Sequence, residues 1–138
     1  FNADLNGLKN RVIVLETDVL KEEPNFENAP FCGIFCDPPS LTQSAKQAEQ
    51  GVREHSRLFS GMALLAAVDA PIVFAACSFH LGPDSFLECI ADASARLHAR
   101  ERGILISAVG TQDVDHPVLA PLPESRYLKC AIGRVVSV

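Results

Sequence analysis

Three short polar or reactive segments each follow an apolar run that has the character of a β-strand. Glu16-Thr17-Asp18 follows residues 12–15, Asp37-Pro38-Pro39-Ser40 follows residues 31–36, and Cys77-Ser78-Phe79-His80 follows residues 72–76. Carboxylates can hold or deprotonate a ligand, and a cysteine thiolate can act as a nucleophile. In an open parallel sheet, ligands bind outside the carboxyl ends of the strands. The three segments therefore predict one common site.

Each of these residues also has a purely structural interpretation. Asp37-Pro38-Pro39 can be a strand-ending turn, because proline fixes φ and has no N–H to donate. Cys77 can be a buried thiol of the core, and His80 can be a surface residue. An acid directly at the end of an apolar strand favours a functional role for Asp37. Cys77 fits a nucleophile if a nearby cation or helix N-terminus lowers its pKa.

A long polar segment precedes the last apolar run of the chain. It contains Asp115-His116-Pro117-Val118 and then Pro123-Glu124-Ser125-Arg126. Loops of this length in compact domains are functional or disordered. Asp115 and His116 resemble a pair of metal ligands, but no third or fourth ligand follows at suitable spacing, so we predict no metal site. The sequence also contains no glycine-rich phosphate-binding motif.

Strand-like and helix-like patterns alternate along the chain, which is typical of an α/β fold with helices on the faces of a parallel sheet. A helix is predicted over about 44–67, with Gly51 and Gly61 as weak points, and a second one after Gly82 that stops at Gly103. Residues 2–10 look like the tail of another helix. We expect strands at residues 12–15, 31–36, 72–76, 104–106 and 127–136.

Composition excludes several classes of protein. The 138 residues carry a net charge of -5, so the chain has no bulk basic field of the kind that binds nucleic acid without sequence preference. No apolar stretch approaches the length of a membrane span, and no signal peptide opens the chain. Five cysteines without C-x-x-C spacing argue against a disulfide framework and a zinc knuckle. We therefore expect a cytoplasmic protein, with an organelle as the alternative.

Taken in order and spacing, these motifs resemble a known enzyme family. Asp37-Pro38-Pro39-Ser40, Ala76-Cys77-Ser78, Asp115-His116-Pro117-Val118 and the block from Pro123 to Lys129 are similar to the class I S-adenosylmethionine-dependent methyltransferases that modify carbon 5 of cytosine in large-subunit ribosomal RNA. The likeness covers essentially the whole chain. It implies a Rossmann-like sheet with helices on both faces and an antiparallel last strand.

The resemblance also implies roles for individual residues. Cys77 would be the nucleophile that adds to carbon 6 of the cytosine, and Asp37 would hold the edge of the base. S-adenosylmethionine would be bound by Asp18, Asp37 and Pro38. The remaining positions that match the family's site would contact the RNA substrate: Pro39, Ser40, Ser78, His80, His116 and Lys129. Arg53, Arg57 and Arg126 would add positive charge near them.

The family's first two strands and its glycine-rich cofactor loop have no counterpart here. In the family's sheet, those strands separate the run at residues 12–15 from the run at residues 31–36. We therefore expect residues 1–138 to be the C-terminal part of a single catalytic domain whose N-terminal remainder is its partner. The alternative is a degenerate, methyltransferase-like module that binds ribosomal RNA without catalysis. A dehydrogenase half is disfavoured, because Asp-Pro-Pro and Cys-Ser have no role in one.

Overall fold

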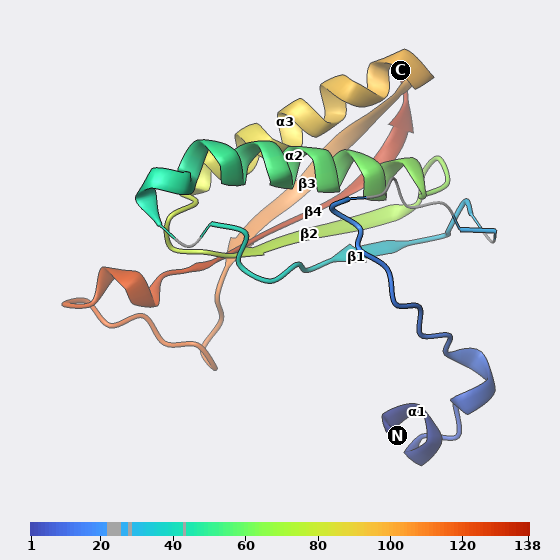
Figure 1. Cartoon of the computed structure of the whole chain (residues 1–138), viewed down its shortest axis with the longest axis horizontal. Helices are drawn as coiled ribbons and strands as arrows, with labels where there is room; N and C mark the ends of the chain where they lie inside the picture. The colour runs from blue at the N-terminus through green and yellow to red at the C-terminus, as the bar shows by residue number, and fades with distance from the viewer. Residues whose placement is uncertain (22–25, 28, 43) are drawn as a thin grey trace.

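A four-stranded sheet forms the centre of the molecule (Figure 1). The computed structural model describes residues 1–21, 26–27, 29–42 and 44–138. The spatial order of the strands is β1 (Ile34–Cys36), β2 (Pro71–Cys77), β4 (Leu128–Ser137) and β3 (Arg102–Thr111). β1 runs parallel to β2, and β4 is antiparallel to both of its neighbours. The predicted α/β class and antiparallel last strand are confirmed.

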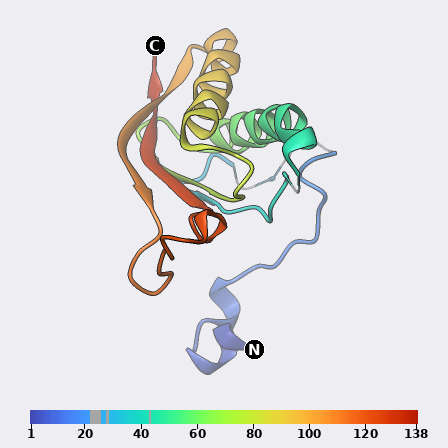
Figure 2. The same ribbon diagram turned by 90° about the vertical axis from the view of Figure 1, so that its left-hand side faces the viewer.

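Two long helices, α2 (Ala48–Leu64) and α3 (Pro83–Leu97), lie side by side on one face of this sheet (Figure 2). α2 connects β1 to β2 and α3 connects β2 to β3, so both crossovers advance across the sheet in the same direction. Right-handed crossovers that advance in one direction place their helices on one face. We call this the covered face and the opposite one the bare face. The helices predicted for the second face are not found in the described residues.

Aromatic residues fill the space between the covered face and the two helices. Phe59 of α2 stacks on Phe74 of β2 with ring centroids 4.3 Å apart, and Phe86 of α3 meets Phe59 edge to face at 6.0 Å. All three side chains are fully buried. Such pairs add attraction beyond the apolar area that they bury. This cluster fixes both helices against β2, the strand that ends at Cys77.

The boundaries of the helices differ from the predictions in two details. α2 continues through Gly51 and Gly61 without a break, preceded by a 3-10 turn at Ala45–Gln47. The left-handed residue that ends the region of α3 is Glu101, with φ of 55°, and not Gly103, which lies inside β3. A 3-10 turn at His98–Arg100 tightens the end of the helix and brings Glu101 to this position. None of the described helices is long and apolar enough to cross a membrane.

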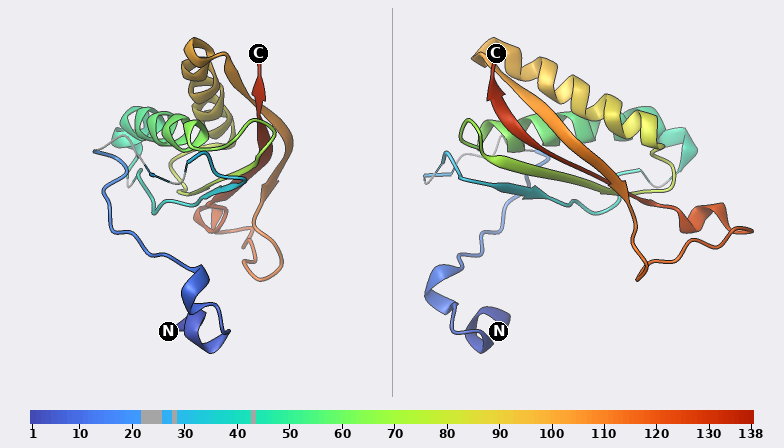
Figure 3. Two further views of the ribbon diagram at one scale, coloured as in Figure 1. Left: turned by 90° about the vertical axis from the view of Figure 1, so that its right-hand side faces the viewer. Right: turned by 180° about the vertical axis from the view of Figure 1, so that it is seen from behind.

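The first fifteen residues contain helical turns but no strand (Figure 3). α1 (Asn2–Leu5) and a 3-10 helix at Lys9–Arg11 correspond to the predicted helix tail. Residues 12–15 do not form the predicted strand, and all four side chains are exposed, Val14 to 88%. A strand needs a neighbour to pair its N–H and C=O groups, and none of the described strands lies beside this segment. The prediction of a strand here is wrong for this structure.

Candidate functional site

The carboxyl ends of β1, β2 and β3 and the first residues of β4 meet at one end of the sheet, where the segment between β3 and β4 projects (Figure 1). Asp37 follows β1 directly, and Cys77 is the last residue of β2. The Cys77 Sγ lies 3.8 Å from the Asp37 Oδ1, so the thiol donates a hydrogen bond to the carboxylate. The fold thus brings together the two residues predicted to be catalytic, which are 40 positions apart.

The surroundings of Cys77 keep its thiol protonated. Partial burial raises the pKa of Cys77 above its ordinary value of 9.0, and the negative charge of Asp37 raises it further. The nearby Lys129 ammonium acts in the opposite direction on the pKa of Cys77. A thiol in this setting needs a base to become a nucleophile. The Asp37 carboxylate, which already accepts the thiol hydrogen bond, is placed to be that base.

Lys129 is buried, with only 4% of its surface exposed. Its Nζ donates hydrogen bonds to the carbonyl oxygens of Ser78 and Tyr127, the latter at 2.8 Å. Burial lowers the pKa of Lys129, and the neighbouring Cys77 raises it. Register explains the placement, because Lys129 pairs with Ala76 and points to the covered face. The ammonium therefore holds the backbone on either side of the site and does not face solvent.

The segment after β1 is attached to the segment after β2. The Ser78 hydroxyl donates to the Thr42 carbonyl at 2.7 Å, and the Ser40 hydroxyl reaches the same oxygen at 3.2 Å. Thr42 is buried against Gly51 of α2, and a methyl group at Gly51 would overlap its side chain. Gly51, which sequence reasoning treated as a weak point of the helix, allows this close approach. The predicted residues Ser40 and Ser78 thus both donate to the carbonyl oxygen of Thr42.

Asp18 lies at a second part of the site. With Pro38 and Pro39 it lines a pocket of about 700 Å³, together with other residues on both sides: Glu16, Thr17, Val19, Leu20, Leu41 and Leu58. Its carboxylate pairs with Lys21 at 3.0 Å, and this lowers the pKa of Asp18. The pocket has an acidic rim and an apolar wall. The three residues assigned to cofactor contact are thus divided, with Asp18 and Pro38 in the pocket and Asp37 beside Cys77.

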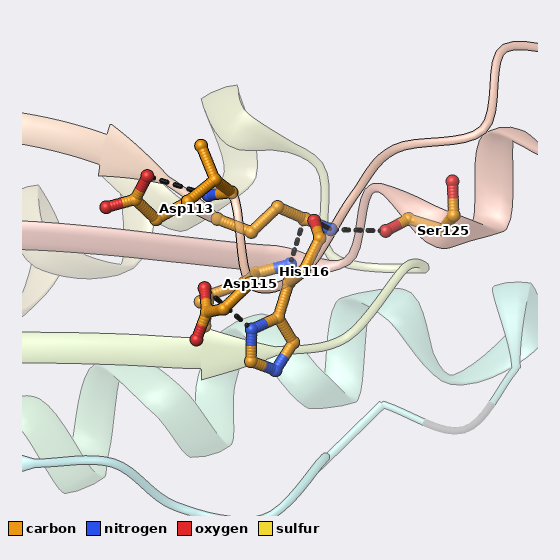
Figure 4. Close-up of polar contacts among 7 residues, drawn as sticks. Asp113, Asp115, His116 and Ser125 are labelled. Atoms are coloured by element: carbon orange, nitrogen blue, oxygen red, sulfur yellow. Dashed lines mark hydrogen bonds and ion pairs between the residues drawn. The ribbon is translucent and has the colours of Figure 1, made fainter.

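The two histidines occupy different surroundings. His80 is exposed and rests against Phe79, with ring centroids 5.5 Å apart, and it makes no hydrogen bond to the described residues of the site. His116 lies in the β3–β4 segment, where its Nδ1 is 3.1 Å from the Asp115 carboxylate (Figure 4). That contact lowers the pKa of Asp115. The described residues contain no group of three or more possible metal ligands.

Sequence reasoning missed Gln112, which lies at the end of β3. Its side chain makes hydrogen bonds to four backbone groups of the β3–β4 segment and the start of β4. Glutamine is a common surface residue, and nothing in its sequence neighbourhood distinguishes this one. The contacts exist only because the antiparallel pairing of β3 and β4 closes the segment into a loop.

The chain is similar to known methyltransferases in sequence. It is 31% identical to ribosomal RNA large subunit methyltransferase I of Shewanella amazonensis over 138 residues, which cover 97% of this chain and 34% of that protein. A ribosomal RNA large subunit methyltransferase of Deinococcus radiodurans is 31% identical over 96 residues, covering 70% of this chain and 22% of its own length. The chain thus spans about a third of the length of the first relative. No family model matches the sequence.

Solved structures agree on the fold. A crystal structure of a candidate methyltransferase in complex with S-adenosylhomocysteine superimposes with a TM-score of 0.55 at 15% identity, covering 73% of this chain and 25% of the other. A candidate S-adenosylmethionine-dependent methyltransferase from Streptococcus mutans gives the same TM-score at 16% identity. Along nearly its whole length the chain is thus similar in sequence to ribosomal RNA large subunit methyltransferases, and it has the Rossmann-like fold of the solved methyltransferase structures.

Proposed function

We propose that this chain provides the nucleophile and base-holding residues of an S-adenosylmethionine-dependent methyltransferase that modifies carbon 5 of a cytosine in ribosomal RNA. The observation that carries the proposal is the 3.8 Å contact between the Cys77 thiol and the Asp37 carboxylate at the carboxyl end of the sheet. Sequence similarity to ribosomal RNA large subunit methyltransferases supports the substrate class. Without a nucleophile, carbon 5 of cytosine is too poor in electrons to accept a methyl group.

The residues around Asp18 fit the adenosine part of the cofactor. The pocket beside Pro38 and Pro39 has a carboxylate rim, which can accept hydrogen bonds from an amino group, and apolar walls formed by Leu41 and Leu58. When bound, S-adenosylmethionine supplies a methyl group on a positively charged sulfur. Asp18 and Pro38 would hold this cofactor on one side of the Asp37 segment, and Cys77 lies on the other.

Cys77 and Asp37 would act as a pair. Asp37 accepts the proton of the Cys77 thiol, and the resulting thiolate forms a bond to carbon 6 of the cytosine, which makes carbon 5 nucleophilic. The Lys129 ammonium would stabilise the thiolate, because its positive charge opposes the burial and the Asp37 charge that raise the pKa of Cys77. After methylation, a water molecule accepts the proton from carbon 5 and the bond between carbon 6 and the Cys77 sulfur breaks. The released thiolate then takes back the proton held by Asp37, which restores the enzyme. The cytosine must be unstacked from its neighbours to reach this site.

The remaining residues at this end of the sheet would contact the RNA. Pro39, Ser40 and Ser78 lie on the two segments that flank the Cys77–Asp37 pair. His80 and His116 present exposed rings, and the exposed Arg126 adds positive charge. Lys129 would act through the backbone that it holds, because its ammonium is buried against two carbonyl groups.

We further propose that residues 1–138 correspond to the C-terminal part of one catalytic domain. Two features support this interpretation. The bare face exposes Phe35 and Ile132, which helices would cover in a complete doubly wound sheet. Residues 12–15 are apolar and exposed, as expected for a strand whose neighbours are not among the described residues.

The decisive experiment traps the covalent intermediate. The full-length protein is incubated with S-adenosylmethionine and ribosomal RNA that contains 5-fluorocytidine. In this nucleotide fluorine replaces the hydrogen at carbon 5 that must leave as a proton, so the bond between the enzyme and carbon 6 persists. We expect a protein–RNA band on a denaturing gel, and a peptide map that places the bond on Cys77. The matched control is Cys130→Ala, because Cys130 is also half-buried and its pKa is raised by burial and by Asp37.

The outcomes separate the alternatives. Loss of the adduct and of methyl transfer in Cys77→Ala, with both retained in Cys130→Ala, supports the proposal. Methyl transfer undiminished in Cys77→Ala would exclude Cys77 as the nucleophile. Wild-type protein that binds ribosomal RNA but neither binds the cofactor nor transfers methyl groups would instead favour a non-catalytic RNA-binding module.

A further inference from the structure

The Gln112 side chain uses all of its hydrogen-bonding capacity at the junction between β3 and the β3–β4 segment, residues 113–126. Its Oε1 accepts from the backbone N–H groups of Tyr127 at 3.1 Å and Leu128 at 3.2 Å. Its Nε2 donates to the carbonyl oxygens of His116, at 3.3 Å, and Ser125 (Figure 4). An amide has two acceptor positions and two N–H groups, so this set is complete.

The same segment is also closed internally by Ser125. Its hydroxyl accepts from the Leu119 N–H at 2.9 Å and donates to the Leu122 carbonyl at 2.7 Å. These hydrogen bonds hold the segment in a compact form. Its side chains remain exposed, among them Val114 at 91% and Leu119 at 56%. The segment is thus ordered while its side chains face solvent.

Gln112 is linked to the nucleophile through Tyr127. The N–H of Tyr127 donates to Gln112, and the carbonyl of Tyr127 accepts from the N–H of Ser78 at 3.0 Å and from the Lys129 ammonium. Ser78 directly follows Cys77, and Cys77 pairs with Leu128 across the strands. The position of the segment relative to the nucleophile is thus set by one residue whose N–H and carbonyl are both bonded.

We propose that Gln112 is a positioning residue that holds the exposed 113–126 segment as one wall of the RNA-binding surface beside Cys77. This inference rests on the proposed function, because it assumes that RNA reaches Cys77 at this end of the sheet. Gln112 itself is half-buried, and its side-chain amide is bonded to the backbone of the segment. Its contribution is to make the wall rigid before RNA binds, which reduces the entropy lost on binding.

The chemistry of the site selects an amide at this position. A carboxylate of the same size could still accept from the two N–H groups of Tyr127 and Leu128. It could not donate to the two carbonyl oxygens, and its negative charge would face them at short range. Gln112→Glu therefore breaks the contacts to His116 and Ser125. It keeps those to the N–H groups of Tyr127 and Leu128.

The experiment compares Gln112→Glu with Gln47→Glu, which adds the same charge at an exposed position before α2. In the full-length protein we expect Gln112→Glu to raise the KM for ribosomal RNA about tenfold, because it loses the two hydrogen bonds that order the segment, with kcat changed by less than about twofold. Cofactor affinity is expected to stay the same. Trypsin should cut after Arg126 severalfold faster, because the segment opens.

Each other outcome overturns the inference. Unchanged KM and unchanged cleavage after Arg126 would show that Gln112 does not position the segment. A fall in kcat at constant KM would place the segment in the chemical step and not in RNA binding. If Gln112→Glu fails to fold, Ser125→Ala serves in its place, since it loosens the segment without touching the sheet, and it should change KM in the same direction. Wild-type protein without methyl transfer would disprove the proposed function itself, and unchanged tryptic cleavage in Gln112→Glu would then also disprove the positioning role.

Discussion

On the covered face of the sheet Phe74 is completely buried, whereas on the bare face Phe35 of the neighbouring strand is 74% exposed. Both lie in short apolar strands of similar composition. Their strands pair in register, with Phe35 opposite Val73 and Val73 opposite Ile132, so the bare face carries a continuous apolar row. Alternation along a strand decides which side chain meets the helices. The catalytic candidate Cys77 shares the parity of Val73 and lies on the bare side.

The largest expected difference concerns stability. Phe74→Ala should reduce the free energy of unfolding by about 3–5 kcal/mol, since it removes the ring that Phe59 stacks on. Phe35→Ala should change it by less than about 0.5 kcal/mol, because its ring is mostly exposed. Urea unfolding of the two variants measures both values. A loss of unfolding free energy in Phe35→Ala as large as that in Phe74→Ala would mean that the bare face is covered.

Buried cysteines under the covered face should react more slowly with alkylating reagents than exposed ones. Burial raises the pKa of Cys36 to about 12 and that of Cys89 to about 11, and both belong to the core under the covered face. At pH 8 we expect iodoacetamide to alkylate them at least about 100-fold more slowly than the exposed Cys32, because so little thiolate forms. Peptide mass spectrometry resolves the sites. Rapid labelling of Cys36 in folded protein would contradict the burial of this face.

His55 provides a pH test of the covered face. Burial lowers the pKa of His55 below its ordinary value of 6.5, and its Nδ1 donates to the Gly51 carbonyl at 2.7 Å. The unfolded chain therefore binds the proton more readily. The neutral His55 contributes fully to the stability of the fold above pH 6.5. This contribution is lost as the pH falls towards the lower pKa that His55 has in the folded state.

We expect unfolding free energy to fall between pH 6.5 and 5 with a slope of at most about 1.4 kcal/mol per pH unit, the limit for one proton. His55→Gln should flatten that slope. The exposed His80→Gln serves as the control and should keep it. Equal slopes in both variants would exclude His55 as the source of the pH dependence of stability.

The smallest expected effect concerns the reactivity of Cys77, on the bare face. Asp37→Asn removes the negative charge that raises the pKa of Cys77, so Cys77 should be alkylated a few times faster at pH 8. Cys130, whose pKa Asp37 also raises, should respond in the same direction. Asp84→Asn, at the exposed start of α3, is the control. Slower alkylation of Cys77 in Asp37→Asn would show that the carboxylate promotes thiolate formation in the free protein.

Much of the local structure could be predicted from the sequence. The apolar runs at residues 72–76 and 104–106 mark β2 and β3, and the pattern after Gly82 marks α3. These predictions succeed because periodicity and helix-start residues act over a few neighbours. The clustering of Asp37 and Cys77 was also predictable, since parallel strands bring their carboxyl ends together.

Other features depend on partners that are distant in sequence. Residues 12–15 have the composition of a strand but no strand beside them, so their composition alone misleads. Lys129 lies in a segment that matches a substrate-contact motif, yet pairing with Ala76 directs it into the protein. The role of Gln112 arises from the return of β4 beside β3. Nothing local distinguishes these residues from others of their type.

The sequence by itself determined the α/β class, the order of the elements and the types of side chain available for chemistry, because each depends on local pattern. Only the tertiary structure decided that both helices cover one face, that Lys129 is buried while Phe35 is exposed, and that Gln112 supports the segment beside Cys77. These outcomes follow from strand order and register, which set the neighbours of each side chain across long stretches of chain.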